Sequence, residues 1–479
     1  MVHFDVTVGL NAGTEGTPLR KIAQDILKMT VPNITGMVLG YVNELTNAAF
    51  VGRTGDDAEL AAVGLGNMMQ NCFGLSIGLG ICSAMDTFVS QAHGAGQYGM
   101  CASYLQRCRV IVTLQLAWMG PLLWYSEALL LAIGQDATVS MHAGAYNRIT
   151  LFGLFFAFQA EAIRKYLLNQ DLTVVPAVIA ALCSILHVGW CAIFVLHLGL
   201  GNQGAGFANV VTWTLECSLC TAYLWHCAPQ LKQSRKSVLS VQREAFLVSG
   251  LKHYIAMAFP SAVAMCSEWW FCEICALIVG YFGPTTLAAH VSATNMCLIF
   301  FMIPLAIQCS AATLVGNALG ANKPKDASRY CWLCVALSLV FWFLISLVLG
   351  FASEPIAAIY TKDVAVRDIM QGLLHIFAVV GFFDSTQNVM AGALRGMGRQ
   401  NLPAMVYVFV YYGIMIPLAL VLGFPLKLGV YGVWYAELTG TGFAAVFFFV
   451  VLKKVNWTTL ASEASERLLL DPSHGAAVH

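Results

Sequence analysis

Three acidic residues stand in the middle of apolar stretches in the C-terminal half of the chain. Glu268 and Glu273 are five residues apart in one stretch, and Asp384 lies in another, seventeen residues after Arg367 and eleven before Arg395. A carboxylate at bilayer depth costs about 3 kcal/mol on insertion scales, so such a group usually faces a cavity and has a function there. The three side chains are therefore candidates for binding a proton or a cation.

No lysine or arginine is predicted at the depth of these acids in the same half of the chain. A proton or an organic cation is thus the favoured partner. Removal of water stabilises the neutral, protonated form of a carboxyl group, and a positive ligand stabilises the charged form. Glu273 lies about 140° around a helix from Glu268, so the two acids line neighbouring faces. Trp269 and Trp270 could offer a cation–π face worth about 1–2 kcal/mol, or could simply pack against lipid and neighbouring helices.

The N-terminal half carries a weaker set of polar residues within its apolar stretches. Glu44, with Asn47 one helical turn later, predicts a polar stripe, and Glu216 lies in the middle of a stretch. Asp86 stands near the predicted end of a stretch, where a bond to backbone or to a basic partner is the favoured interpretation. For Glu437, in the last stretch, structural and functional interpretations are evenly balanced.

The composition shows which elements must hold these side chains. The chain has 479 residues, of which 58% are hydrophobic and 10% charged, whereas soluble domains carry about 25% charged residues. Residues 172–215 and 274–322 contain no Asp, Glu, Lys or Arg, and each run could hold two membrane spans of about 20 residues. The net charge of zero excludes nucleic-acid binding through a basic surface. An all-α polytopic membrane protein in the lipid bilayer is predicted.

Apolar stretches separated by polar residues predict twelve membrane-spanning helices. They cover approximately residues 27–50, 60–90, 108–132, 140–161, 174–198, 204–227, 253–280, 286–318, 329–352, 367–394, 402–424 and 430–452. An even number of spans places both termini on one side of the membrane. With both termini in the cytoplasm, 20 of the 25 basic residues fall inside, and Arg53, Arg148, Lys362, Arg367 and Lys427 fall outside. This bias predicts cytoplasmic termini.

The two halves of the chain resemble each other at a displacement of about 226 to 231 residues. Leu60 to Ala95 resembles Leu287 to Ala321, Leu200 to Ala208 resembles Leu428 to Ala436, and Arg164, Gln170 and Pro176 correspond to Arg395, Gln400 and Pro403. Equivalent blocks are six spans apart, so the halves are related by a pseudo-two-fold axis along the membrane normal, as in alternating-access carriers. The predicted division is an N-terminal segment 1–26, an N-lobe 27–227, a linker 228–252, a C-lobe 253–452 and a C-terminal tail 453–479.

Proline residues inside predicted spans indicate bends that could help a cleft open and close. They are Pro32, Pro260, Pro304 and Pro417, and each lacks the N–H that a helix interior needs. No nucleophile–base pair, metal-ligand cluster or phosphate loop is visible in the sequence, so an enzyme is not expected. We therefore expect no metal and no cofactor, with a proton gradient as the energy source.

Several segments together identify a known family. They are Ser83-Ala-Met-Asp86-Thr-Phe-Val-Ser-Gln91-Ala-His-Gly94-Ala, Lys165-Tyr-Leu-Leu-Asn169-Gln170, Ser267-Glu268-Trp269-Trp270, Pro304 with Val315-Gly316-Asn317-Ala-Leu-Gly320-Ala, and Gly392-Ala-Leu-Arg395-Gly396. In these motifs, over almost its whole length, the chain resembles the multidrug and toxic compound extrusion (MATE) transporters, most closely the animal proton-coupled organic cation antiporters. The motif residues Asp86, Gln91, Arg164, Asn169, Gln170, Pro304, Asn317 and Arg395 are assigned a structural role.

The resemblance implies two lobes in a V around a central cavity that exchange external protons for cytoplasmic organic cations and drugs. It implies a monomer in the plasma membrane and places the family's essential acids on Glu268, Glu273 and Asp384. In two places the chain departs from the family. An acid that mammalian members carry in span 286–318 aligns with Asn295, and a prokaryotic aspartate in span 27–50 aligns with Asn47.

The departures place ion coupling in the C-terminal half and leave Glu44 as a weaker candidate. Trp269, Trp270, Asn295, Glu44 and Asn47 remain possible residues of a substrate cavity. Two alternatives to proton-coupled drug efflux stay open. One is a sodium-coupled drug antiporter, and the other is a lipid-linked sugar flippase of related architecture, which should have a more basic cavity.

Overall fold

The computed structural model describes residues 17–239 and 242–471, and these residues are helical apart from short turns. Residues 1–16 of the predicted N-terminal segment and 472–479 of the predicted tail lie outside the described residues.

The first half consists of long helices, some of them interrupted by short 3-10 or π segments. Its elements are α1 (Leu19–Val51), η1 (Gly52–Thr54), α2 (Asp57–Gln70), η2 (Asn71–Leu75), α3 (Ser76–Ser83), α4 (Met85–Gly94), α5 (Tyr98–Trp124), α6 (Ser126–Ala132), α7 (Ala137–Leu168), α8 (Val174–Cys191), η3 (Ala192–His197) and α9 (Gly201–Cys227). Segments η2 and η3 are π-helical, and such segments often occur at functional sites.

The second half begins after a connection that contains α10 (Arg235–Leu239) and η4 (Arg243–Phe246). Its long elements are α11 (Val248–Gly280), α12 (Pro284–Gly320), α13 (Pro324–Tyr360), α14 (Val364–Gly396), α15 (Asn401–Val408), η5 (Phe409–Met415), α16 (Ile416–Gly423) and α17 (Val430–Lys454), followed by α18 (Trp457–Leu469). Segment η5 is π-helical.

Each of the twelve predicted spans coincides with one long helix or with consecutive helices. The helices run further than the apolar stretches, because polar first and last turns continue the helix beyond them. Helix α1, for example, begins at Leu19 rather than at residue 27. By length and composition alone, eight helices among the described residues could cross a membrane. The remaining spans bury polar side chains within the protein, such as Asn47, Asn147 and Lys165.

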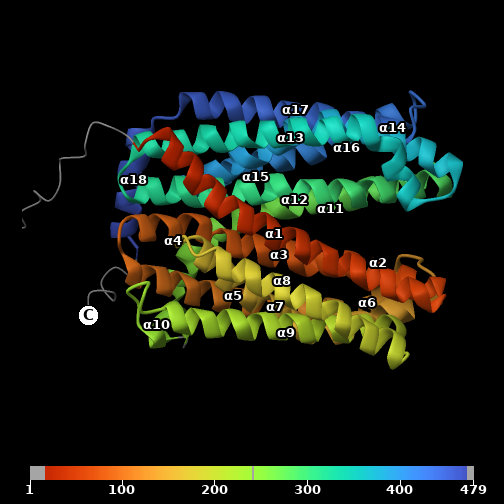
Figure 1. Ribbon diagram of the computed structural model, residues 1–479, viewed down its shortest axis with the longest axis horizontal. Coiled ribbons are helices and arrows are strands. Elements are labelled where there is room, and N and C mark those ends of the chain that lie inside the picture. Colours follow the sequence, from red (N-terminus) through yellow and green to blue (C-terminus); the bar gives the residue numbers. More distant parts are fainter. Residues whose placement is uncertain (1–16, 240–241, 472–479) are drawn as a thin grey trace, which may run out of the picture.

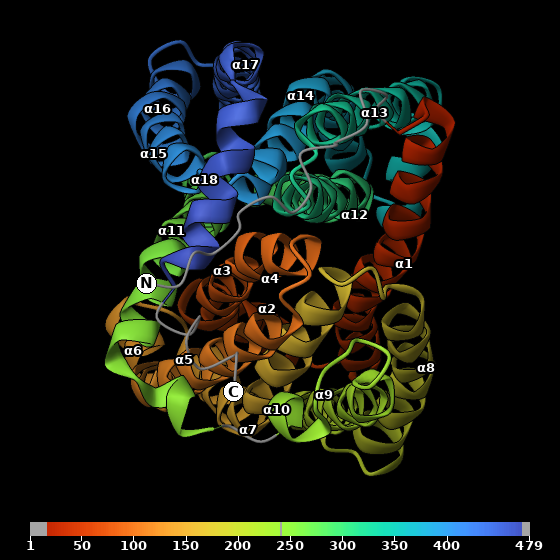
Figure 2. The same ribbon diagram turned by 90° about the vertical axis from the view of Figure 1, so that its left-hand side faces the viewer.

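The helices form two lobes that lie side by side (Figure 1; Figure 2). Helices α1 to α9 make the N-lobe and α11 to α17 make the C-lobe. The first turns of α1, however, pack in the C-lobe, and the first turns of α11 pack in the N-lobe. Ile22 and Ile26 of α1 belong to the core of the C-lobe, whereas Tyr254 and Ala258 of α11 belong to the core of the N-lobe. The lobes are therefore tied together by two equivalent crossing helices, as the predicted pseudo-two-fold axis requires.

The internal repeat extends to backbone conformation. Five residues of the first half with positive φ, at Gly55, Gly96, Asp171, Gly199 and Gly201, have positive-φ counterparts 226 to 228 residues later. The counterparts are Gly283, Asn322, Gly398, Lys427 and Gly429. Left-handed backbone is rare outside glycine, so its recurrence at equivalent turns supports the repeat independently of the apolar pattern.

Three of the four proline residues predicted to bend spans lie inside continuous helices. Helices α1, α11 and α12 run without a break through Pro32, Pro260 and Pro304. Pro417 alone among the four follows a π segment, η5. Neighbouring helices can satisfy the backbone groups that a proline frees, so these positions need no break.

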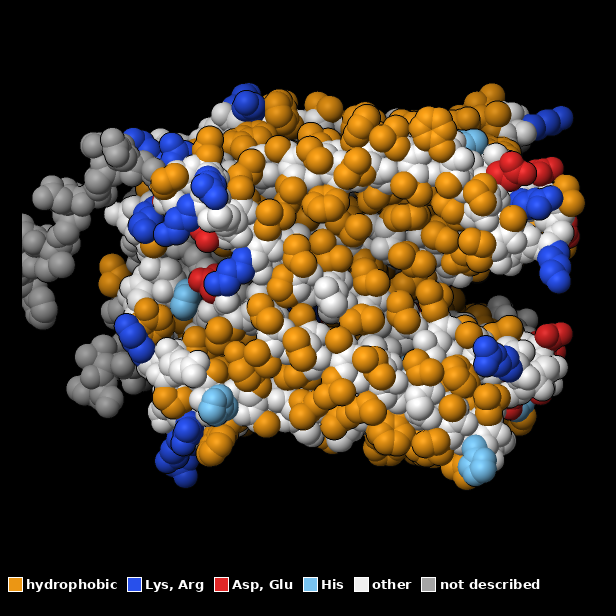
Figure 3. Space-filling model, in the orientation of Figure 1, with side chains coloured by type: hydrophobic (Ala, Val, Ile, Leu, Met, Phe, Trp, Pro, Cys, Tyr) orange, Lys and Arg blue, Asp and Glu red, His pale blue; other side chains and the backbone are white. Residues whose placement is uncertain are grey.

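The lobes touch most closely where α4 meets α12, at a place we call the closed end. A Cβ atom added to Gly94 of α4 would collide with the carbonyl oxygen of Asn317, and one added to Gly320 of α12 would collide with that of Gln91. At the opposite end, where α2 and α14 begin, Figure 3 shows the surface hollowed between the lobes. The structure is therefore closed at one end and open at the other.

Replacement of Gly320 by alanine is expected to force the lobes apart at the closed end, because the new methyl group meets backbone of the opposite lobe rather than a flexible side chain. Interlobe overpacking of this kind costs about 1–3 kcal/mol. The matched control is Gly350→Ala in α13, where an added Cβ meets nothing within 4 Å. The measurement is the interlobe distance at the closed end, by double electron–electron resonance. An unchanged distance distribution in Gly320→Ala would contradict this expectation.

Candidate functional site

Glu268 of α11 and Asp384 of α14 face each other inside the C-lobe. Glu268 interacts electrostatically with Asp384 and lies beside the amide of Asn388. Asp384 Oδ1 accepts hydrogen bonds from Gln387 Nε2 at 3.0 Å and from Asn388 Nδ2 at 3.1 Å. Two amides one turn further along α14 thus hold the aspartate, and Tyr407 donates to Asn388 Oδ1 at 3.3 Å.

Aromatic side chains form the wall beside these two acids. Tyr407 and Tyr411 have ring centroids 5.4 Å apart, and Phe271 of α11 lies 5.0 Å from Tyr411. Both tyrosines interact electrostatically with Glu268 and with Asp384. The arrangement combines negative charge with ring faces, which is the chemistry that attracts an organic cation.

Glu437 of α17 adds a third carboxyl group to the cluster. It interacts electrostatically with both Asp384 and Glu268. Within residues 17–239 and 242–471, no lysine or arginine forms an ion pair with any of the three acids. Arg395 is the base that acts on Glu268 electrostatically, but its guanidinium is directed to Asp86 instead. The C-lobe cluster therefore carries excess negative charge.

Glu273 and Trp270 lie on a different face of α11, towards the N-lobe. Trp270 Nε1 donates a hydrogen bond to the carbonyl oxygen of Cys72 in η2 at 3.0 Å, and Glu273 acts electrostatically on the same cysteine. Trp269 is half-buried between the two faces. Asn295 of α12 accepts a weak hydrogen bond from Tyr41 of α1, at 3.4 Å to its side-chain oxygen. These residues thus lie between the lobes rather than in the acid cluster.

A buried group of charges joins the lobes at the closed end. Lys165 Nζ of α7 donates to both carboxylate oxygens of Asp86 at 3.1 Å, and Arg395 Nε of the C-lobe lies 3.8 Å from Asp86 Oδ2. Asn169 Nδ2 also donates to Asp86, and its oxygen accepts from Thr313 of α12 at 2.8 Å. The basic partner that the sequence suggested for Asp86 is therefore Lys165, assisted by Arg395 from the opposite lobe.

The other predicted structural residues mostly lie near this ion group. Gln91 Nε2 donates to the carbonyl oxygen of Gly396 across the lobes at 2.9 Å, and Asn317 Nδ2 donates to Asp171 Oδ1 at 3.3 Å. Gln170 is buried at the end of α7, and Pro304 is buried within α12. These contacts hold the closed end together, apart from Pro304, which packs in the middle of its helix.

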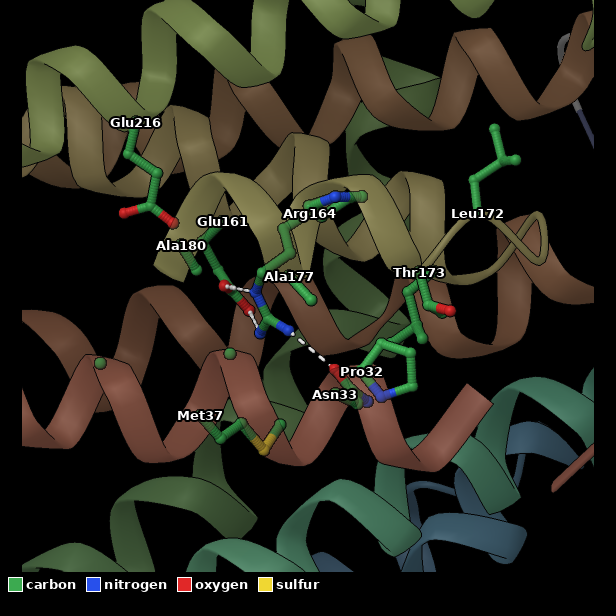
Figure 4. Close-up of a pocket in the computed structure, with 14 residues that line it drawn as sticks. Pro32, Asn33, Met37, Glu161, Arg164, Leu172, Thr173, Ala177, Ala180 and Glu216 are labelled. Atoms are coloured by element: carbon green, nitrogen blue, oxygen red, sulfur yellow. Dashed lines mark hydrogen bonds and ion pairs between the residues drawn. The ribbon is translucent and has the colours of Figure 1, made fainter. Parts of the chain in front are cut away.

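A separate cavity of about 200 Å³, lined by charged and apolar side chains, lies in the N-lobe (Figure 4). Arg164 pairs with Glu161 through two hydrogen bonds of 2.7 Å and donates to Asn33 Oδ1 at 3.2 Å. Glu216 faces the same cavity and a smaller one of about 100 Å³, which Glu44 also lines. Arg164 therefore belongs to the interior of the N-lobe, although its repeat partner Arg395 lies between the lobes.

Asn47 takes part in a buried hydrogen-bond network. Its Nδ2 donates to Asn209 Oδ1 at 2.9 Å, and its Oδ1 lies 3.1 Å from His187 Nε2. Asn209 in turn donates to Tyr146 Oη at 2.9 Å. Neutral amides thus occupy in the N-lobe the place that Glu437, the repeat partner of Asn209, occupies in the C-lobe.

Comparison with known proteins agrees with this two-lobe architecture. The MatE family model matches residues 32–193 and 260–421, one match in each lobe and together more than half of the chain. The chain belongs to the MatE family. This MatE protein is a multi-pass membrane transporter.

Relatives of the MatE protein share most of its length. It is 27% identical to the mouse multidrug and toxin extrusion protein 2, over 96% of this chain and 79% of the relative. It is 30% identical to protein DETOXIFICATION 29 of Arabidopsis thaliana, over 85% of this chain and 81% of the relative. The crystal structure of the eukaryotic MATE transporter AtDTX14 superposes with a TM-score of 0.86 and 25% identity, covering 94% and 99% of the two chains.

The MatE fold brings together residues that no sequence pattern placed side by side. Glu268 and Asp384 meet, but Glu273 does not join them. The sequence left Glu437 undecided and did not single out Gln387, Asn388, Tyr407 or Glu161. A polar run Asp384, Gln387, Asn388 at helical spacing is the one signal that could have indicated part of the site.

Proposed function

We propose that this MatE transporter exports organic cations in exchange for protons by alternating access. The observation that carries the proposal is the cluster of Glu268, Asp384 and Glu437, with which no lysine or arginine of the described residues forms an ion pair. Charges of one sign so close together in a membrane protein require a positive ligand or protonation. Either a proton or a cation can meet that need.

Protons and the organic cation compete for the same carboxylates, and this competition couples their movements. When a cation occupies the cluster, the negative charge that would hold protons is already neutralised, so protons leave. When protons return, the cation loses its partners and is released. The buried side-chain oxygen of Gln387, which accepts no hydrogen bond from the described residues, is a further acceptor beside Asp384. The rings of Tyr407, Tyr411 and Phe271 favour a flat or quaternary cation over a small inorganic one.

The similarity to multidrug and toxin extrusion proteins supports a drug-like substrate range. The relatives with this name include the human protein 1, which is 27% identical over 93% of this chain. A site that combines aromatic rings with carboxylates recognises charge and apolar surface without demanding one shape, which suits many substrates. The pyrophosphate of a lipid-linked sugar would be repelled by this cluster.

The orientation in the membrane follows from the basic residues. The face with the larger share of lysine and arginine is expected in the cytoplasm. At the closed end, Arg467 contacts Gln91 and Arg399 pairs with Glu463 of α18, and Lys453 lies in the last turn of α17, just before α18. In this orientation the open end faces the outside, so external protons can reach the C-lobe. We place the transporter in the plasma membrane as a monomer, since one chain supplies both lobes.

A single experiment separates the coupling ions. The purified transporter is reconstituted into proteoliposomes that are loaded with a fluorescent organic cation. Exchange of this cation is then measured under a pH gradient or a sodium gradient of equal size. Exchange driven by the pH gradient and indifferent to sodium is expected. Exchange that follows only the sodium gradient would replace proton coupling with sodium coupling, and indifference to both would refute the antiport mechanism.

A further inference from the structure

The last described helix, α18, lies across the closed end and contacts both lobes. It runs from the C-lobe towards the N-lobe (Figure 2). Leu460, Ala461 and Ala464 in its first turns belong to the core of the C-lobe. Leu468 in its last turn belongs to the core of the N-lobe. One short helix is thus embedded in two bodies that alternating access must move relative to each other.

Charged side chains of α18 also contact both lobes. Glu463 pairs with Arg399 of the C-lobe at 2.7 Å. One turn later, Arg467 Nη1 donates to Gln91 Oε1 of the N-lobe at 2.6 Å. Gln91 itself donates to Gly396 across the closed end, so Arg467 holds a side chain that already joins the lobes.

Asp471, two residues beyond α18, is the strongest of these anchors. Its carboxylate is fully buried, with 0% of the side chain exposed, and its partner Arg107 of α5 is 2% exposed. Arg107 Nη1 lies 3.3 Å from both carboxylate oxygens, and Tyr104 donates to Asp471 Oδ2 at 2.9 Å. His253 of α11 lies 3.4 Å from the same oxygen. These partners lie in α5 and in the first turns of α11, which pack against the core of the N-lobe.

We propose that α18 and Asp471 form a latch that holds the closed end shut and must release the N-lobe before that end opens. A rigid helix with one end in each lobe cannot follow both when they separate. Separating the partners of a buried ion pair costs free energy, so the Asp471–Arg107 pair opposes opening of the closed end. The exposed Arg399–Glu463 pair contributes little to this barrier. The inference rests on the alternating-access part of the proposed function and not on the coupling ion.

Two native cysteines report on the latch. Cys309 of α12 lies at the contact between the lobes, where its Sγ is 3.3 Å from Lys165 Nζ, and it is 4% exposed. Cys82 is 0% exposed in the core of the N-lobe, next to Cys108. Opening of the closed end exposes Cys309, whereas loss of the N-lobe fold exposes Cys82.

The test uses the full chain in lipid nanodiscs and a water-soluble maleimide, with the labelled cysteines located by peptide mass spectrometry. Asp471→Asn is expected to raise the labelling rate of Cys309 at least about tenfold, because labelling follows the population of the open state. Cys82 labelling should stay unchanged. The matched control is Glu466→Gln, which removes an exposed carboxylate from the same helix and should change neither rate.

Asp471→Asn leaves Arg107 buried without its partner, so a second variant guards against misfolding. Arg467→Gln removes the hydrogen bond from α18 to Gln91 of the N-lobe and leaves no buried charge behind, and it should also raise Cys309 labelling. Unchanged Cys309 labelling in both variants would overturn the latch. A parallel rise of Cys82 and Cys309 would also overturn it, because the contact would then support the N-lobe fold only. Neither measurement requires transport, so failure of the proposed exchange is seen separately.

Discussion

Asp384→Asn and Glu268→Gln are each expected to reduce proton-driven exchange of an organic cation to background. Each substitution removes a group that can bind and release a proton, with little change in shape. Loss of a charged partner costs a bound group about 1.5–3 kcal/mol, which corresponds to about a 10- to 150-fold weaker binding of the cation. Loss of proton binding adds to this effect, so the exchange rate should fall further than the affinity.

The measurement is uptake of a fluorescent cation into proteoliposomes under an imposed pH gradient. Asparagine at position 384 can still accept from Gln387 and Asn388, so the fold should persist and thermal unfolding should be nearly unchanged. Asp368→Asn is the matched control, since Asp368 is an exposed residue of the same helix. Normal exchange in both Asp384→Asn and Glu268→Gln would remove the C-lobe acids from the coupling mechanism.

Asp86→Ala is expected to destabilise the closed end more than any other single substitution there. The change leaves Lys165 and Arg395 buried next to each other without a counter-charge. Breaking a buried ion pair by removing one partner costs about 3–5 kcal/mol. This loss of stability should appear as a lower midpoint of thermal unfolding in detergent. It should also reduce the fraction of molecules in which this end is closed.

A double variant distinguishes the loss of charge balance from the loss of packing. Asp86→Asn combined with Lys165→Met removes one acid and one base together, so it should recover part of the stability that Asp86→Ala loses. Asp57→Asn, at an exposed position in the first turn of α2, is the control and should unfold like the unmodified protein. Equal unfolding midpoints for Asp86→Ala and the unmodified protein would show that the ion group does not hold the lobes.

Sequence patterns were reliable where the physical cause is local. The length of an apolar stretch decides whether a helix can span a bilayer, and all twelve spans coincide with helices. The repeat was visible for the same reason, because equivalent turns need equivalent residues, and the paired left-handed positions agree with it. The bends predicted at Pro32, Pro260 and Pro304 stay predictions, since the structure shows only that these residues lie inside continuous helices.

By itself, the sequence determined that this protein is a twelve-helix, two-lobe membrane transporter of the MatE family, with uncompensated acids in its C-terminal half. Only the tertiary structure decided which of those acids meet. A helix turns about 100° per residue, so Glu273 faces the N-lobe while Glu268, five residues earlier, faces Asp384 and Glu437. The partners of Asp86 and Asp471 are likewise distant in the chain, because side chains are paired by helix packing and not by spacing along the sequence.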